Sequence, residues 1–255
     1  LSAADRRHLS AGGGSAIIGV LECGAGQRAG HAGITVDAGT DVGAGLALGV
    51  CARTRGQSQA EPEMMILASA SPRRRELLQQ IGVQFRCEAA DIDETPIAGE
   101  APQQYVERMA LSKARVLLSK YPGDVVLGSD TTVVLHGRIL GKPADSADAE
   151  AMLEDLSGQT HQVMTAVAVV SQVAERVQTV ITRVRFSSLS RQQIKDYVAT
   201  GEPSDKAGGY GIQGLGAVLV DSIEGSYSNV VGLPLTETAA LLQQAGISIW
   251  NKDRV

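Results

Sequence analysis

The residues with the clearest chemical potential form a segment rich in hydroxyl and guanidinium groups at positions 69–74. Ser69, Ser71, Arg73 and Arg74 can all donate hydrogen bonds to phosphate oxygens. If a helix begins directly after Ser71, its first backbone N–H groups and its dipole add further donors. The segment therefore predicts a phosphate-binding turn, and an ordinary helix cap with solvated arginines is an equally good explanation.

A second candidate is the acid Asp130, which follows an apolar stretch in the segment 128–132. We expect this stretch to be a strand that ends near residue 128, and ligands of open α/β sheets bind at the carboxyl ends of strands. A carboxylate there could take a proton from water or hold a metal ion. The alternative is a turn aspartate that hydrogen-bonds to its own backbone.

Two lysines and an acidic run supply further charge. Lys113 falls on an expected long helix among polar neighbours, and Lys142 lies in a short loop stiffened by Pro143. An ammonium group suits phosphate oxygens, although each lysine taken singly is better explained as a solvated surface residue. One carboxylate of the run 91–94 could share a magnesium or manganese ion with Asp130, because both metals prefer oxygen ligands. The alternative for the run is a charged loop.

Other familiar motifs are absent or misplaced. Residues 209–214 match the glycine spacing of a dinucleotide-binding loop, but a polar loop precedes them and a predicted strand follows them. The true motif needs a strand before it and a helix after it. The chain also has no P-loop, no H-E-x-x-H zinc motif and no nucleophile elbow. A P-loop kinase and a dinucleotide oxidoreductase are therefore disfavoured.

The elements that would position these residues alternate between strand and helix from residue 65 onward. Ser71 and Ser190 are typical N-caps, Pro72 suits a first helical position, and Gly82 and Gly158 follow helix ends. Strands are expected at 65–68, 83–88, 124–128, 162–170, 176–186 and 217–223, a hairpin at 133–140, a loop at 201–216, and helices at 72–82, 103–120, 146–156, 190–200 and 234–244. The sum is an α/β fold with a mixed twisted sheet and flanking helices.

The chain divides near residue 64. Residues 1–63 contain 13 of the 29 glycines and no aromatic residue, so few large side chains offset the entropy of ordering. A disordered leader and an upstream stretch included by a wrong choice of start are the competing explanations. We favour the second, because Met64 and Met65 lead directly into the first predicted strand. The apolar stretch 16–21 is too short for a secretory signal.

The bulk composition limits the class of protein. A chain of 255 residues, 44% hydrophobic and 20% charged, fits a globular α/β domain. The net charge of −5 and the lack of a basic stripe argue against nucleic-acid binding. No apolar run reaches the roughly 18–20 residues of a membrane span. Cys23, Cys51 and Cys87 fit neither a disulfide framework nor a metal site, which favours free thiols in the cytoplasm.

Taken together and in order, the motifs closely resemble the Maf family of nucleoside triphosphate pyrophosphatases, over about three quarters of the chain. The resemblance runs through the blocks 67–74, 91–94, 113–114, 128–131, 141–143, 157–161, 205–214, 225–227 and 229–234. It implies a Maf/ITPase-like fold with two α/β lobes around a cleft, formed by residues 64–255. It also implies hydrolysis of the bond between the α and β phosphates, a divalent cation and a homodimer.

The resemblance further assigns roles to residues. Asp130 matches the family's general base, and Glu94 would help it at the metal. Ser69, Ser71, Arg74, Lys113 and Lys142 would contact the triphosphate. The three positions that separate the subfamilies read Arg73, Thr131 and Gln213, which resembles the branch that acts on dTTP and UTP.

A hypothesis for the reaction follows from these roles. Asp130 activates a water that attacks the α phosphorus, while the metal and the lysines offset charge on the pyrophosphate leaving group. Gln213 offers both a donor and an acceptor to a uracil or thymine edge. The alternative function is a nucleotide-binding regulator of cell division, since the family has been linked to septum formation. The physiological substrate, a normal or a modified pyrimidine nucleotide, stays open.

Overall fold

The long strands β3 (Val125–Leu135), β5 (Thr160–Val170) and β6 (Glu175–Phe186) form the centre of a mixed seven-stranded sheet. The computed structural model describes residues 65–251, and the expectation for residues 1–63 lies outside this range. The strand order is β2-β1-β3-β5-β6-β7, with β4 paired to β3. The outer strands are β1 (Met65–Ala68), β2 (Arg86–Glu88), β4 (Arg138–Leu140) and β7 (Val220–Glu224).

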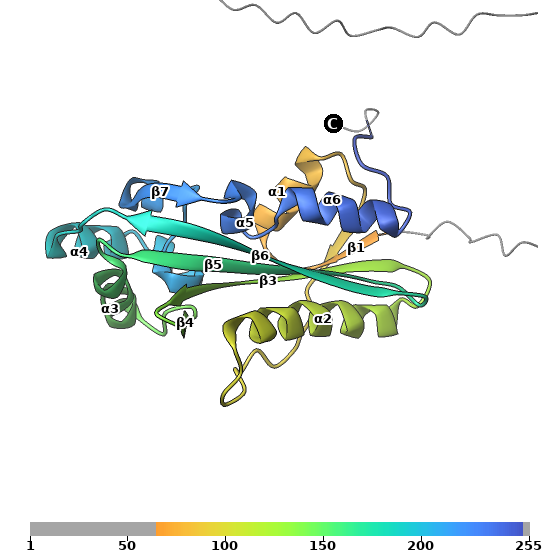
Figure 1. Cartoon of the computed structure of the whole chain (residues 1–255), viewed down its shortest axis with the longest axis horizontal. Helices are drawn as coiled ribbons and strands as arrows, with labels where there is room; N and C mark the ends of the chain where they lie inside the picture. Colours follow the sequence, from red (N-terminus) through yellow and green to blue (C-terminus); the bar gives the residue numbers. More distant parts are fainter. Residues whose placement is uncertain (1–64, 252–255) are drawn as a thin grey trace, which may run out of the picture. The chain divides into compact units, whose positions relative to one another are not determined.

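Helices cover both faces of this sheet. Helix α2 (Pro102–Lys120) lies along one face of the long strands, and α1 (Pro72–Gln80), α5 (Tyr227–Val231) and α6 (Leu235–Gln244) lie on the other (Figure 1). Helices α3 (Ser146–Leu156) and α4 (Arg191–Ala199) pack at the end of the long strands that is remote from β1 (Figure 1). Among the described residues, no helix is both long and apolar enough to cross a bilayer.

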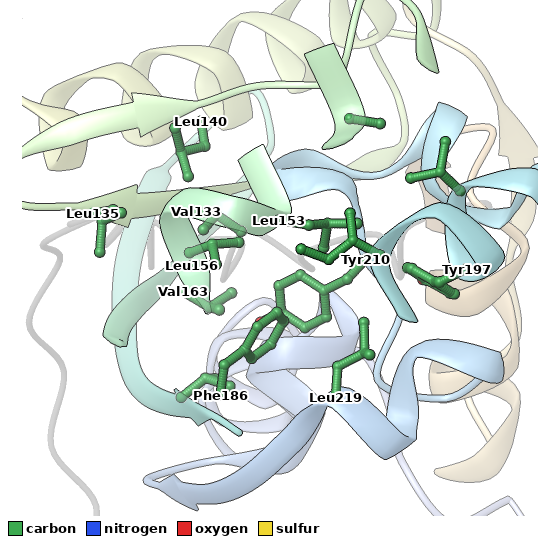
Figure 2. Packing of buried hydrophobic residues seen from close by; sticks show 14 residues of the cluster. Val133, Leu135, Leu140, Leu153, Leu156, Val163, Phe186, Tyr197, Tyr210 and Leu219 are labelled. Atoms are coloured by element: carbon green, nitrogen blue, oxygen red, sulfur yellow. The ribbon is translucent and has the colours of Figure 1, made fainter. Parts of the chain in front are cut away.

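The apolar core forms three clusters on the shared sheet. One lies between α2 and the strands, a second under α1 and α6, and a third under α3 and α4. In the third cluster the rings of Phe186 and Tyr210 meet edge to face at 4.7 Å, surrounded by Leu153, Leu156 and Leu219 (Figure 2). The predicted α/β fold, a mixed sheet with flanking helices, is confirmed.

One edge of β3 changes partner along its length. Residues 125–128 pair in parallel with β1, and residues 133–135 pair antiparallel with β4. On its other edge β3 pairs with β5 without interruption from Val126 to Val134. Residues 129–132 therefore have no strand neighbour on the first edge within the described part of the chain. This gap in the sheet contains Ser129, Asp130, Thr131 and Thr132.

Most predicted elements are confirmed, but three boundaries were wrong and some short helical turns were missed. Strand β3 does not end near residue 128 but continues through Asp130 to Leu135, because pairing with β5 supports it. Strand β2 covers only the last part of 83–88. Residues 215–219 form a 3-10 helix, η3, instead of the start of a strand. The predicted loop 201–216 contains two more 3-10 turns, η1 (Glu202–Asp205) and η2 (Ala207–Gly209), and helix α5 was not predicted.

Candidate active site

A cavity of about 720 Å³ opens where the sheet has its gap. The turn between β1 and α1 forms one wall, and the segments after β4 and around η1 and η2 form the opposite wall. Every residue for which the sequence predicted a catalytic, phosphate, metal or specificity role lines this cavity. The volume is within the range of small-molecule sites.

Hydrogen bonds within the turn at 69–74 fix its shape. Ser71 is the N-cap of α1, and its hydroxyl accepts from the backbone N–H of Arg74 at 3.5 Å. The hydroxyl of Ser69 accepts from the N–H of Ser71 at 3.1 Å and from Arg74 Nη1 at 3.3 Å. Because the Ser69 oxygen serves as an acceptor in both bonds, its own proton remains for a ligand. The turn thus offers hydroxyl and backbone donors at the start of a helix.

The guanidinium group of Arg74 ties three parts of the chain together. Its Nε donates to Gly232 O at 2.8 Å, Nη1 to Ser129 O at 2.9 Å, and Nη2 to Thr131 Oγ1 at 3.0 Å. The bond to Ser129 O satisfies a carbonyl on the open edge of β3. Burial lowers the pKa of Arg74, and the positive charge of Arg73 adds to this effect, while Asp130 opposes it. Most of the five N–H donors of Arg74 are engaged by the protein itself.

A buried ion pair lies on the α2 side of the gap. Lys113 Nζ is 2.7 Å from Asp130 Oδ1 and 2.7 Å from Glu94 Oε1. Lys113 and Asp130 are each only 8% exposed, whereas Glu94 remains exposed to solvent. The prediction that Lys113 alone would be a solvated surface residue was wrong. Its burial is visible in the sequence, because it continues the buried stripe of α2 formed by Val106, Met109, Ala110, Ala114 and Leu117.

The surroundings of Glu94 favour its ionised form overall. Burial by itself would raise the pKa of Glu94, but the hydrogen bond from Lys113 and the charges of Lys113, Lys142 and Arg74 lower it overall. Three positively charged groups from distant parts of the chain thus act on one carboxylate. Such a concentration of charge in a cavity is typical of sites that handle phosphates.

The opposite wall carries the remaining predicted residues. Lys142 is exposed in the loop after β4, and Gln213 is exposed in the turn 211–214, where Gly214 N bonds to Gly211 O at 3.4 Å. Arg73 reaches across from α1 and approaches Asp205 Oδ2 at 3.9 Å. The segment 209–214 is followed by a 3-10 helix and not by an α-helix, so its resemblance to a dinucleotide loop is accidental, as predicted.

Comparison with known proteins decides the family. A family model described as Maf-like protein matches residues 64–245. The chain belongs to the Maf family. Three curated relatives are each named dTTP/UTP pyrophosphatase. The one from Symbiobacterium thermophilum is 54% identical over 188 residues, which cover 74% of this chain and 97% of the relative. Those from Myxococcus xanthus and a Shewanella species are 54% and 56% identical and are covered to 96% and 98%.

Two further side chains of this Maf domain, for which the sequence predicted no role, also line the cavity. Tyr105, on α2, donates from its hydroxyl to the carbonyl of Glu94 at 3.0 Å, and burial raises its pKa to about 12. Lys206 donates to Glu202 O at 2.7 Å and to Asp205 Oδ1 at 2.6 Å. Tyr105 directly precedes the buried stripe of α2, and this position could have predicted that its side chain lies near the site. Nothing local distinguished Lys206 from a solvated loop lysine.

Proposed function

We propose that the chain is a nucleoside triphosphate pyrophosphatase that converts dTTP and UTP to the nucleoside monophosphate and pyrophosphate. The observation that carries this proposal is the buried pair of Lys113 and Asp130 in a cavity edged by the turn at 69–74. Relatives of 54–56% identity that bear the name dTTP/UTP pyrophosphatase support the choice of substrates. A homodimer in the cytoplasm is the assembly and location that the family resemblance supports.

In this proposal Asp130 is the general base. One carboxylate oxygen accepts the hydrogen bond from Lys113 at 2.7 Å, which orients the group and leaves the second oxygen to take a proton from water. The water oxygen attacks the α phosphorus, the bond from that phosphorus to the bridging oxygen breaks, and pyrophosphate leaves. Donors of the turn at 69–74, with Lys113 and Lys142, stabilise the charge that gathers on the phosphate oxygens.

The donor set fits a divalent cation. Glu94 and Asp130 bring carboxylate oxygens to the same ammonium nitrogen, so both could hold one cation together with the triphosphate. Within residues 65–251 no group of three or more His, Cys, Asp or Glu gathers. Magnesium suits this arrangement, because it commonly takes one or two carboxylates and completes its shell with phosphates and water. When bound, the ion would supply positive charge against the triphosphate.

Base choice is proposed to depend on Arg73, Thr131 and Gln213. Each lines the cavity, and Gln213 offers a carboxamide that could hydrogen-bond to a pyrimidine edge. A site that hydrogen-bonds one base rejects another strongly, because the wrong base leaves polar groups without partners.

The decisive test is the release of pyrophosphate from each nucleoside triphosphate with magnesium or manganese. We expect dTTP and UTP to be the best substrates. In Asp130→Asn the rate should fall by about 10²–10⁴, because an amide cannot accept the proton. A non-hydrolysable α,β-imido UTP should still bind to this variant.

The matched control is Asp155→Asn, which removes a surface carboxylate that pairs with Arg138 and does not line the cavity. It should retain full activity. Near-normal turnover by Asp130→Asn would exclude Asp130 as the base. A complete lack of pyrophosphate release by the unaltered protein would contradict the proposed function itself and favour a nucleotide-binding regulator.

A further inference from the structure

A hydrogen-bonded pair outside the cavity holds the segment that carries Gln213. Glu202 begins η1, and its Oε2 accepts from the backbone N–H of Leu215 at 2.8 Å. Its Oε1 accepts from the N–H of Gly216 at 3.0 Å and from the hydroxyl of Tyr197 at 2.9 Å. One carboxylate therefore binds the segment 211–216 at its C-terminal end.

Tyr197 binds the same segment at its other end. Its ring is buried in the cluster under α3 and α4, and its hydroxyl accepts from the N–H of Gly211 at 3.1 Å. The same hydroxyl donates to Glu202, so the two side chains act as one unit, which we call the Tyr197–Glu202 clasp. Gln213 lies between the two attachment points, at the turn 211–214.

The segment lies directly against the clasp, with no room for side chains between them. A Cβ atom at Gly211 would be 2.7 Å from Lys206 Cε and 3.1 Å from Glu202 Oε1, and one at Gly216 would be 2.5 Å from the Tyr197 hydroxyl. A Cβ atom at Gly214 would collide with Glu202 Oε2. These glycines are therefore needed for the close approach of the backbone to the clasp.

The charge state of the clasp favours strong hydrogen bonds. Burial by itself would raise the pKa of Glu202, but bonds from the N–H groups of Gly216 and Leu215, from Tyr197, and the charge of Lys206 lower it overall. Hydrogen bonds to an ionised acceptor are about twice as strong as neutral ones. Burial raises the pKa of Tyr197, so its hydroxyl keeps the proton that it donates to Glu202.

We propose that Glu202 and Tyr197 are positioning residues for base selection. They fix the backbone on both sides of Gln213, so that its carboxamide meets the pyrimidine edge in one place. Discrimination by hydrogen bonds requires placement to within about 0.5 Å, which an unheld loop does not provide. This inference rests on the proposed function and extends it to two residues that do not line the cavity.

The test uses Glu202→Gln and Tyr197→Phe in the full chain, with UTP and CTP as substrates. In Glu202→Gln an amide N–H₂ must face a backbone N–H, and in Tyr197→Phe the bonds to Gly211 and Glu202 are lost. For both variants we expect the ratio of kcat/KM for UTP to kcat/KM for CTP to fall about tenfold. Inhibition by inorganic tripolyphosphate, which probes phosphate binding alone, should change by less than about twofold.

Two comparisons separate positioning from a general loss of structure. Glu154→Gln removes a surface carboxylate of α3 that pairs with Arg191, and it should leave both measurements unchanged. Gln213→Ala should reproduce the loss of selectivity. An unchanged UTP to CTP ratio in a folded variant, or a parallel loss of tripolyphosphate affinity, would overturn the inference.

The remaining outcomes are also distinguishable. If Glu202→Gln does not fold, Tyr197→Phe decides, because it keeps the buried ring and removes a single hydroxyl. If the unaltered protein releases pyrophosphate selectively from UTP and dTTP but the variants keep this selectivity, only the positioning role fails. If the unaltered protein releases none, the proposed function fails as well.

Discussion

The hydroxyl of Thr131 takes part in two hydrogen bonds of opposite direction. Its oxygen accepts from Arg74 Nη2 at 3.0 Å and lies 3.0 Å from Thr165 Oγ1. The only proton of the Thr165 hydroxyl goes to Asn229 O at 2.9 Å. Thr131 must therefore donate its own proton to Thr165. A residue proposed to separate the subfamilies thus also connects Arg74 to the buried interior.

We expect Thr131→Val to lower the free energy of unfolding by about 1–3 kcal/mol, because at nearly constant volume it removes the acceptor of Arg74 Nη2 and the donor to Thr165 Oγ1. Urea denaturation measures this difference. Thr131→Ser keeps the hydroxyl and should lose less than about 1 kcal/mol. Equal stability of the valine and serine variants would show that the network contributes nothing to the fold.

At the scale of elements, the site depends on how closely α2 approaches β3. Gly128 faces the helix, and a Cβ atom there would collide with Ala110 O and lie 3.0 Å from Ala114 N. This close approach lets Lys113, one turn along from Ala110, reach Asp130, two residues along β3 from Gly128. The absence of one side chain on β3 therefore places two charged groups in contact.

Gly128→Ala should separate α2 from β3 and cost about 1–3 kcal/mol of stability, as overpacking of a core usually does. The distance between Lys113 and Asp130 should grow, so pyrophosphate release should slow as well. Both are measurable by urea denaturation and by the nucleotide assay. Gly123→Ala is the control, since nothing lies within 4 Å of its added Cβ atom, and it should change stability by less than about 1 kcal/mol. Similar behaviour of the two variants would refute the packing explanation.

At the scale of the whole molecule, a neutral histidine is built into the cluster under α3 and α4. His161 is 1% exposed, its Nε2 is 2.8 Å from the Tyr210 hydroxyl, and its ring meets that of Phe186 at 5.0 Å. Its Nδ1 has no partner among the described residues. Burial lowers the pKa of His161 to about 4. The folded protein thus resists a protonation that the unfolded chain accepts at about pH 6.5.

The sign of the resulting pH dependence follows from linkage. Between pH 6.5 and about 4 the unfolded chain binds a proton at this histidine and the folded protein does not, so stability falls as the pH falls through this window. The full contribution is about 3 kcal/mol. We expect urea denaturation of His161→Gln to show a shallower loss between pH 7 and 4.5. His136→Asn, at an exposed hairpin position, should keep the slope of the unaltered protein. Identical slopes for the unaltered protein and both variants would contradict the assignment of this pH dependence to His161.

Local chemistry determined much of this protein from its sequence alone. Ser71 and Pro72 start α1, and Ser190 with Gln193 forms the capping box of α4, because caps and first-turn residues act within a few positions of the chain. The hairpin turns where predicted, with positive φ at His136 and Gly137. The order of the motifs was sufficient for the family, and every candidate site residue lines one cavity.

Contacts between distant residues decided the rest. Strand β3 extends through Asp130 because β5, more than thirty residues later, pairs with it. The 3-10 helix at 215–219 begins where Glu202 accepts the N–H groups of Leu215 and Gly216. Lys113 pairs with Glu94 and Asp130. Glu94 lies in a loop before α2 in the chain, and Asp130 lies in a strand after it. Propensity acts over a turn or a cap, whereas pairing, burial and charge compensation depend on neighbours in space, and only the folded chain brings those neighbours together.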